Sequence, residues 1–109
     1  MAPGYLLVTM HISDPERYKQ YLAEAPKSVQ AFGGEYLVRG GRHETLEGEW
    51  NPHRIAVLRF PSYEKAKAFY DDAQYTQTRQ LRQGTTEYFN MVLVEGFEGA
   101  IPQNLDARR

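Results

Sequence analysis

The sequence of 109 residues contains no cysteine, so disulfide bonds, thiolate catalysis and cysteine-ligated zinc are excluded. It also lacks a strong charge of either sign, since the formal net charge is -1. Surfaces that bind nucleic acid or anionic lipid normally have an excess of Lys and Arg, so we expect neither partner. No apolar run approaches the roughly 20 residues of a membrane span. The N-terminus lacks the positive charge of a secretory signal, and we therefore expect a cytoplasmic protein.

The length corresponds to a single domain, which we expect to occupy residues 1–97. Residues 98–109 have little periodicity and are expected to form a C-terminal tail. Aromatic residues are frequent, with eight Tyr, five Phe and one Trp. Tyr combines an apolar ring with a polar tip, which suits interfaces and half-polar pockets.

The apolar pattern predicts the order strand, helix, strand, strand, helix, strand. The first helix follows a cap at Ser13 or Asp14 and stops at Gly33-Gly34, and Pro26 predicts a kink or break within it. Its apolar stripe recurs at spacings of three and four and consists of Tyr18, Tyr21, Leu22, Ala25, Val29 and Phe32. The second helix follows a cap at Ser62 and is expected in the segment "PSYEKAKAFYDDAQY", which ends at Tyr75. A further short helix is expected in "QTRQLRQGT" and ends at Gly84. The strands are predicted over residues 5–12, 35–41, 53–60 and 86–97, with a bulge or bend at Gly40-Gly41.

This order is typical of an α+β fold, the ferredoxin-like βαββαβ arrangement with a four-stranded antiparallel sheet. Helices cover one face of such a sheet. The other face would present Tyr5, Leu7, Thr9 and His11, a mixture too apolar to be bare and too polar to be plain core. Since a second copy is the natural cover, we expect a homodimer in which two sheets pack as a dimeric α/β barrel.

Three segments in order, "YLVRGG", "LEGEWNPHR" and "LRFPSYEKAKAFYDDAQY", carry a specific combination of short motifs. With them the chain resembles the family called domain of unknown function thirteen-thirty, from about Tyr5 to Gly96. That family belongs to the dimeric α/β-barrel superfamily, which implies the same fold. Relatives in the superfamily include cofactor-free monooxygenases, polyketide cyclases, lactone isomerases and haem enzymes. The chain departs from the usual pattern at Phe69, where Trp is expected, and this change would reshape the wall of a pocket.

Arg39, just before the Gly pair, is the first candidate site residue. A guanidinium on a sheet face needs carboxylate or carbonyl partners, and Glu47 in the following turn is one candidate. Arg39 either binds an anionic or carbonyl oxygen of a ligand, oriented by Glu47, or forms a buried ion pair with Glu47 that pins the hairpin. Arg54 is either a second cation at the pocket mouth or part of a strand-end salt bridge. Trp50 is either a lid over a small-molecule pocket or an interface residue.

His11 is the histidine best placed for chemistry, as a general base or a metal ligand on the mixed face of the first strand. His43 and His53 flank the hairpin tip. No histidine pair has the spacing of a helical metal site, so no metal is expected.

The sharpest catalytic hypothesis combines Tyr5, Tyr75, Arg39 and Asn90, which are predicted to converge where the sheet meets the helices. Tyr75 and Arg82 lie seven residues apart and share a face if the short helix is continuous. A Tyr, Asn and Arg set stabilises an enolate or oxyanion without a metal or cofactor. The same residues would also suit a polar dimer interface.

Two functions therefore remain open. One is a cofactor-free isomerase, cyclase or monooxygenase that acts on a small carbonyl-bearing or aromatic acid. Arg39 would bind the anion, Tyr75 or His11 would move the proton, and Asn90 would support the oxyanion. The other is a dimer that binds a small molecule, or serves a structural or stress role, without chemistry.

Overall fold

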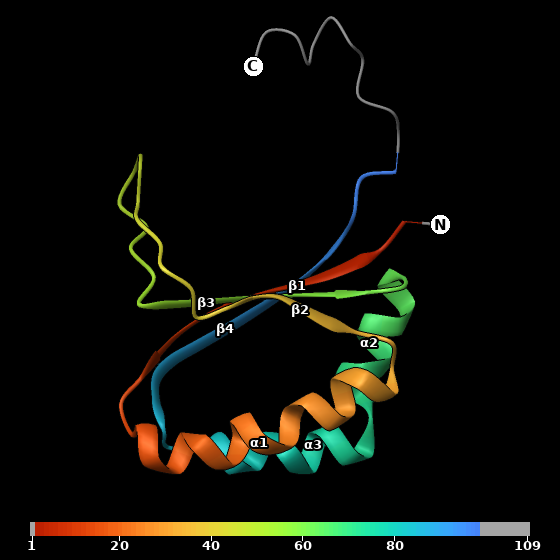
Figure 1. The fold of residues 1–109 in the computed structure, drawn as a ribbon, viewed down its shortest axis with the longest axis horizontal. Coiled ribbons are helices and arrows are strands. Elements are labelled where there is room, and N and C mark those ends of the chain that lie inside the picture. Colours follow the sequence, from red (N-terminus) through yellow and green to blue (C-terminus); the bar gives the residue numbers. More distant parts are fainter. Residues whose placement is uncertain (1, 99–109) are drawn as a thin grey trace, which may run out of the picture.

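A four-stranded antiparallel sheet with its helices on one face forms the body of the computed structural model, which describes residues 2–98 (Figure 1). The strands are β1 (Gly4–Ile12), β2 (Glu35–Arg39), β3 (Arg54–Phe60) and β4 (Thr86–Glu95), in the order β2-β3-β1-β4. The helices are α1 (Pro15–Ala31), α2 (Tyr63–Asp71), α3 (Ala73–Arg79) and the short 3-10 helix η1 (Gln80–Arg82). The predicted α+β, ferredoxin-like arrangement is confirmed. The predicted tail lies outside the described residues, apart from Glu98.

The core forms between the sheet and α1, because alternate strand residues face the helices. Leu6, Val8 and Met10 of β1 are buried, as are Ala56, Leu58 and Phe60 of β3. From α1, the predicted inner stripe meets them with Tyr18, Tyr21, Ala25 and Val29. Each large apolar side chain that is fully buried contributes about 1.5–3 kcal/mol.

The predicted second helix divides into two, because Asp72 lies in extended backbone with a ψ of 139°. Its side chain accepts the backbone N–H of Tyr75 at 3.1 Å, which starts α3 as an N-cap. The expectation of one helix from Ser62 through Tyr75 was therefore wrong in its boundary. The cap at Ser62 itself is confirmed, since its hydroxyl accepts the N–H of Lys65.

Helix α1 runs unbroken through Pro26, so the predicted interruption does not occur. A proline has no N–H to donate to the carbonyl four residues earlier, which here is that of Leu22. The helix tolerates this loss because the carbonyl finds another donor, described below.

The bulge that was predicted at Gly40-Gly41 lies instead inside β2. Tyr36 pairs with Leu58, but the next paired residue is Val38, opposite Val57, so Leu37 is the extra residue. Residues 36 and 39 would face opposite sides of a regular strand. Because of the bulge, Tyr36 and Arg39 both face the helices, opposite Leu58 and Ala56.

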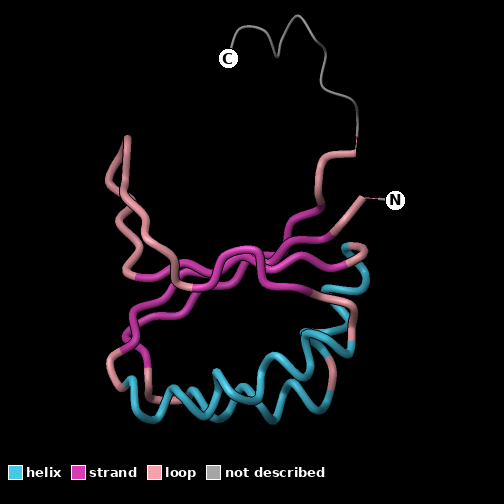
Figure 2. Tube along the Cα trace, viewed as in Figure 1, coloured by secondary structure: helices cyan, strands magenta, loops and turns pink. Residues whose placement is uncertain are grey.

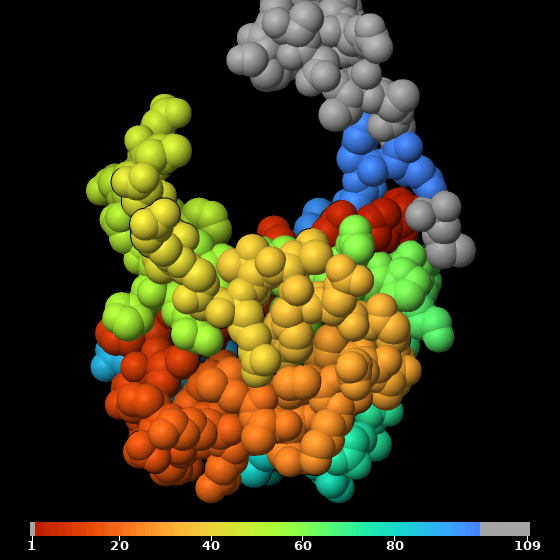
Figure 3. Space-filling model, in the orientation of Figure 1, coloured from red at the N-terminus to blue at the C-terminus, as the bar shows by residue number. Residues whose placement is uncertain are grey.

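Residues 40–53 form an arm that projects from the sheet, on the side away from the helices (Figures 1 and 2). His43 contacts the carbonyl oxygens of Gly41 and Pro52, and the Thr45 hydroxyl donates to the carbonyl of Trp50 at 2.7 Å. In the space-filling view the arm stands clear of the body of the molecule (Figure 3). These hydrogen bonds stay within the arm, which therefore forms a hairpin closed upon itself.

We expect Gly40→Ala to lower the free energy of unfolding by about 1–2 kcal/mol, because Gly40 has a left-handed φ of 73°. A Cβ there would also meet the guanidinium of Arg54. Gly41→Ala is the matched control, since a Cβ on Gly41 meets nothing within 4 Å. Its stability is expected within about 0.5 kcal/mol of wild type. Urea unfolding at fixed protein concentration measures both, and equal losses would contradict the assignment.

Candidate ligand-binding cavity

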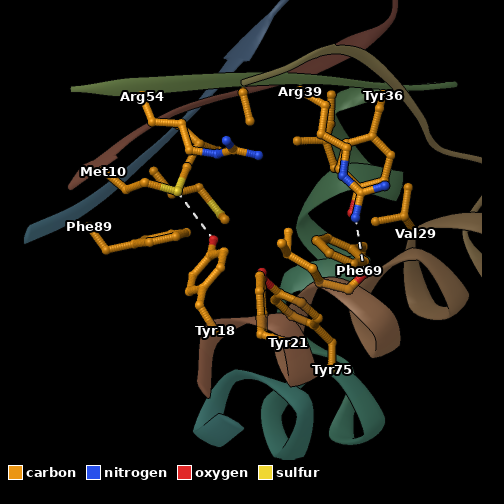
Figure 4. A pocket seen from close by; sticks show the side chains of 15 residues that line it. Met10, Tyr18, Tyr21, Val29, Tyr36, Arg39, Arg54, Phe69, Tyr75 and Phe89 are labelled. Carbon is orange, nitrogen blue, oxygen red and sulfur yellow. Dashed lines mark hydrogen bonds between the residues drawn. The ribbon is translucent and has the colours of Figure 1, made fainter. Parts of the chain in front are cut away.

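A hollow between the helix-facing side of the sheet and helices α1 and α3 is the candidate site (Figure 4). The space in it that is open to water is about 40 Å³. All of the space between the lining atoms, including open solvent at the mouth, is about 460 Å³. The wall is mostly apolar, with six polar or charged side chains among the lining residues: Tyr18, Tyr21, Tyr36, Tyr75, Arg39 and Arg54. No Asp or Glu among residues 2–98 lines it. The cavity thus has two fixed positive charges and no carboxylate to balance them.

Arg39 reaches the cavity because the β2 bulge turns it toward the helices. Its Nη2 donates to the carbonyl oxygen of Leu22 at 3.0 Å, the same carbonyl that Pro26 leaves without a helical donor. Its guanidinium also lies 4.6 Å from the centre of the Tyr36 ring, within cation–π range. One side chain therefore joins the edge strand to the middle of α1, while remaining exposed at the cavity mouth.

Arg54 opens β3 and lies across the mouth from Arg39 (Figure 4). Its guanidinium packs against Gly40, whose lack of a Cβ leaves the necessary room. Within residues 2–98 it forms no ion pair with a carboxylate. The predicted strand-end salt bridge is therefore absent from this part of the chain, and the guanidinium faces the cavity instead.

Three tyrosines form the wall opposite the arginines (Figure 4). The hydroxyls of Tyr21 on α1 and Tyr75 on α3 share a short hydrogen bond, and the Tyr18 hydroxyl donates to the Met10 sulfur at 3.2 Å. Burial raises the pKa of Tyr18 and of Tyr75 well above the usual value of 10, and it raises the pKa of Tyr36 to about 12. These phenols therefore stay protonated at neutral pH and act as hydrogen-bond donors.

Arg82 stands behind this wall, with its guanidinium carbon 3.6 Å from the centre of the Phe89 ring and 5.2 Å from that of Tyr21. Its charge lowers the pKa of Tyr75 and so offsets part of the effect of burial. Although α3 gives way to η1 between Tyr75 and Arg82, the two side chains do come together.

Phe69 forms part of the apolar wall and is only 1% exposed. Its ring centre lies 4.2 Å from that of Tyr75 and 5.0 Å from that of Phe60. The stack holds the Tyr75 ring in place and thereby directs its hydroxyl toward Tyr21.

Tyr5 and Asn90 do not join Arg39 and Tyr75, so the predicted convergence of these four residues was wrong. Asn90 pairs with Thr9, and its side chain contacts the Thr9 hydroxyl at 3.4 Å on the open face of the sheet. Tyr5 pairs with Val94 on the same face. Strand alternation separates them from the cavity, because their neighbours Leu6, Phe89 and Met91 are the residues that face the helices.

His11, Glu47 and Trp50 also lie away from the cavity. The His11 ring stacks on His53 at 3.9 Å between ring centres, with the Glu87 carboxylate 3.9 Å away. Glu47 and Trp50 belong to the arm, and Trp50 is 71% exposed. Within residues 2–98, Glu47 makes no ion pair with Arg39, and Trp50 does not cover the cavity.

Three residues of the cavity were not predicted from the sequence: Tyr18, Tyr21 and Tyr36. Tyr18 and Tyr21 were assigned to the apolar stripe of the first helix. The feature that could have identified them as site residues is the hydroxyl group of each side chain. A stripe of Leu would need no partners, whereas two phenols on a buried face each need a hydrogen-bond partner or a ligand.

Among residues 2–98 no group of three or more His, Cys, Asp or Glu side chains is placed to hold a metal ion. None of the described helices has both the length and the apolar character needed to cross a membrane.

We expect a double-mutant cycle between Pro26→Ala and Arg39→Met to show coupling of about 0.5–1.5 kcal/mol. With Pro26 present, Arg39→Met removes the side-chain donor to the Leu22 carbonyl. In the Pro26→Ala background the helix supplies an N–H at this position, so the loss should be smaller. Urea unfolding at fixed protein concentration measures the cycle. The same cycle with Arg42→Met, in the arm, is the control and should show no coupling. Coupling near zero for Arg39 would contradict the assignment.

Comparison with solved structures identifies neighbours that share the fold. A protein of unknown function from Rhodopseudomonas palustris has a TM-score of 0.72 at 15% identity, over 90% of this chain and 85% of that chain. A Nitrosomonas europaea protein, provisionally named an antibiotic biosynthesis monooxygenase, has a TM-score of 0.54 at 15% identity, over 86% and 89% of the two chains. A dimeric ferredoxin-like protein of unknown function from Thermobifida fusca has a TM-score of 0.52 at 10% identity, over 86% and 91%.

No functionally curated protein matches the sequence. The family comparison does match, and it covers most of the chain, from residue 3 to residue 97. The chain therefore belongs to the family described as domain of unknown function (DUF1330).

Proposed function

We propose that this chain binds a small organic acid in the cavity, with the acid group held by Arg39 and Arg54. The supporting observation is the charge of the lining: two guanidinium groups face an apolar hollow, and no Asp or Glu of the described part of the chain lines it. Unbalanced positive charge near low-dielectric walls attracts an anion. A guanidinium also matches the two oxygens of a carboxylate, to which it donates paired hydrogen bonds.

The size of the cavity restricts the acid. The space open to water, about 40 Å³, has room for about three water molecules. The acid group is therefore proposed to sit at the mouth beside Arg39, while a short apolar body reaches inward. That body would contact side chains such as Met10, Phe69 and Met91.

A catalytic role is the finer proposal: a cofactor-free isomerase, cyclase or monooxygenase reaction on a small carbonyl-bearing or aromatic acid. Arg39 would hold the acid group and Tyr75 would donate a hydrogen bond to the reacting oxygen. The monooxygenase name of the Nitrosomonas europaea neighbour motivates this class, although its likeness to this chain is one of fold. His11 and Asn90 are not included, because they lie on the opposite face of the sheet.

The alternative is a dimer that binds a small molecule without chemistry. Apolar side chains on the open face of the sheet favour self-association: Leu7 is 42% exposed, Val92 is 57% and Val94 is 41%. We propose that a second copy covers them, as two sheets packed face to face. The Thermobifida fusca neighbour is itself described as dimeric.

Arg54→Gln is expected to weaken binding of a short carboxylate at least tenfold, because it removes a charged hydrogen-bond donor. Isothermal titration calorimetry with butanoate and pentanoate measures the dissociation constants. Arg42→Gln removes the same charge from the exposed arm and should change affinity less than twofold. If neither acid binds the wild type at millimolar concentration, or if Arg42→Gln is equally harmful, acid binding at this site is refuted.

Val92→Glu is expected to convert a dimer of the wild type into single chains, because it places charge in the centre of the proposed interface. Light scattering coupled to gel filtration at micromolar concentration measures the mass. Ala68→Glu, on the exposed side of α2, serves as the control and should remain dimeric. A wild-type mass of one chain would refute the dimer.

A further inference from the structure

The hydrogen bond between Tyr21 and Tyr75 leaves one hydroxyl proton of this cavity wall without a partner. The two phenols hold two hydroxyl protons, and their mutual hydrogen bond uses one of them. The other proton has no oxygen acceptor among the described residues. Arg82 stands beside both rings and supplies only donors.

The surrounding groups do not supply the missing acceptor. Tyr18 directs its hydroxyl at the Met10 sulfur, and a thioether is a weak acceptor. Arg82 Nε is buried without a hydrogen-bond partner. Burial also raises the pKa of Tyr75, which keeps its phenol protonated and prevents it from serving as an anionic acceptor.

The donors lie at two separate places in the cavity. Figure 4 shows Arg39 and Arg54 on the sheet side and the tyrosine hydroxyls on the helix side, with apolar side chains such as Met10 and Phe69 around the space between them. A molecule that satisfies both places needs two oxygen-bearing groups joined by a short apolar body.

We infer that the Tyr21–Tyr75 pair binds a carbonyl oxygen of the ligand, so that the acid taken by this cavity is an oxo acid. The inference rests on the proposed binding of an acid group by Arg39 and Arg54. A carbonyl oxygen only accepts hydrogen bonds, so it can take the hydroxyl proton that the Tyr21–Tyr75 hydrogen bond leaves free. The positive charge of Arg82 behind the pair further favours an oxygen with partial negative charge.

The same free hydroxyl proton determines which of several related acids should bind most tightly. A hydroxyl group at the carbonyl position can accept the same hydrogen bond, but its own proton then needs an acceptor, and the Arg82 guanidinium already competes for the phenol oxygens. A methylene group leaves the phenol proton unpaired. Affinity should therefore be highest for the oxo acid and lower for both the hydroxy acid and the unsubstituted acid.

The test compares pentanoate with 2-oxopentanoate, 4-oxopentanoate and 4-hydroxypentanoate by isothermal titration calorimetry on the full chain. We expect at least one oxo acid to bind about fivefold more tightly than pentanoate, the effect of one additional net hydrogen bond. 4-Hydroxypentanoate should gain no more than twofold. The two oxo positions sample different separations between the acid group and the carbonyl.

Removal of both hydroxyls, Tyr21→Phe with Tyr75→Phe, should abolish the oxo preference and leave pentanoate affinity within twofold of wild type. Each single substitution should keep a preference, because the remaining hydroxyl still has a free proton. Tyr63→Phe, with a ring 39% exposed and outside the cavity lining, is the matched control. Thermal unfolding and retained pentanoate binding establish that the double variant is folded.

The outcomes separate the two proposals. If pentanoate binds the wild type but no oxo acid is preferred, the inference fails while acid binding stands. If the preference survives in the double variant, the carbonyl is not held by this pair and the inference is overturned. If none of the four acids binds, acid binding fails and the inference falls with it.

Discussion

A single backbone carbonyl, that of Leu22, links the two halves of the candidate site. Pro26 deprives it of its helical donor, and Arg39 takes that place from the neighbouring edge strand. Arg39 points in this direction only because Leu37 bulges out of the β2 ladder. Pro26 interrupts the hydrogen bonding of α1, and Leu37 interrupts the hydrogen bonding of the sheet. The two irregularities compensate each other across the cavity mouth. Without Pro26, the Leu22 carbonyl would accept a helical N–H and would not need Arg39. Without the bulge, the Arg39 guanidinium would face the other side of the sheet.

The sheet separates two kinds of surface. Its helix-facing side holds a hollow whose polar groups are tyrosines and arginines, whereas its open side presents exposed apolar residues such as Val92 together with the His11–His53 stack. Strand alternation divides these sets residue by residue. The proposed ligand site on one face and the proposed self-association on the other therefore place independent demands on the sequence. Neighbouring residues of one strand can contribute to different proposed roles.

Much of the fold could be predicted from local pattern, but the geometry of the site could not. Caps at Asp14 and Ser62, the Gly33 stop and the alternation of β1 and β3 are local signals, and they predicted the element order correctly. The bulge at Leu37 gave no signal, because Leu is an ordinary strand residue. Asn90 was assigned to the wrong face because β4 is apolar on both sides, with Phe89, Met91 and Leu93 on one and Val92 and Val94 on the other. Pro26 in a helix implies that the Leu22 carbonyl lacks its helical donor. Its partner, Arg39, belongs to a different element, so local sequence pattern could not identify it.

The way Arg39 is held also bears on how fast a molecule can enter and leave. Its side chain is exposed and makes one hydrogen bond to the helix. Exposed side chains change rotamer within picoseconds to nanoseconds, whereas lids and domains open over microseconds to milliseconds. For the proposed ligand, movement of the Arg39 side chain itself belongs to the faster kind of motion. Association should therefore be limited by diffusion and the attraction of charge, and the residence time should depend on contacts inside the cavity.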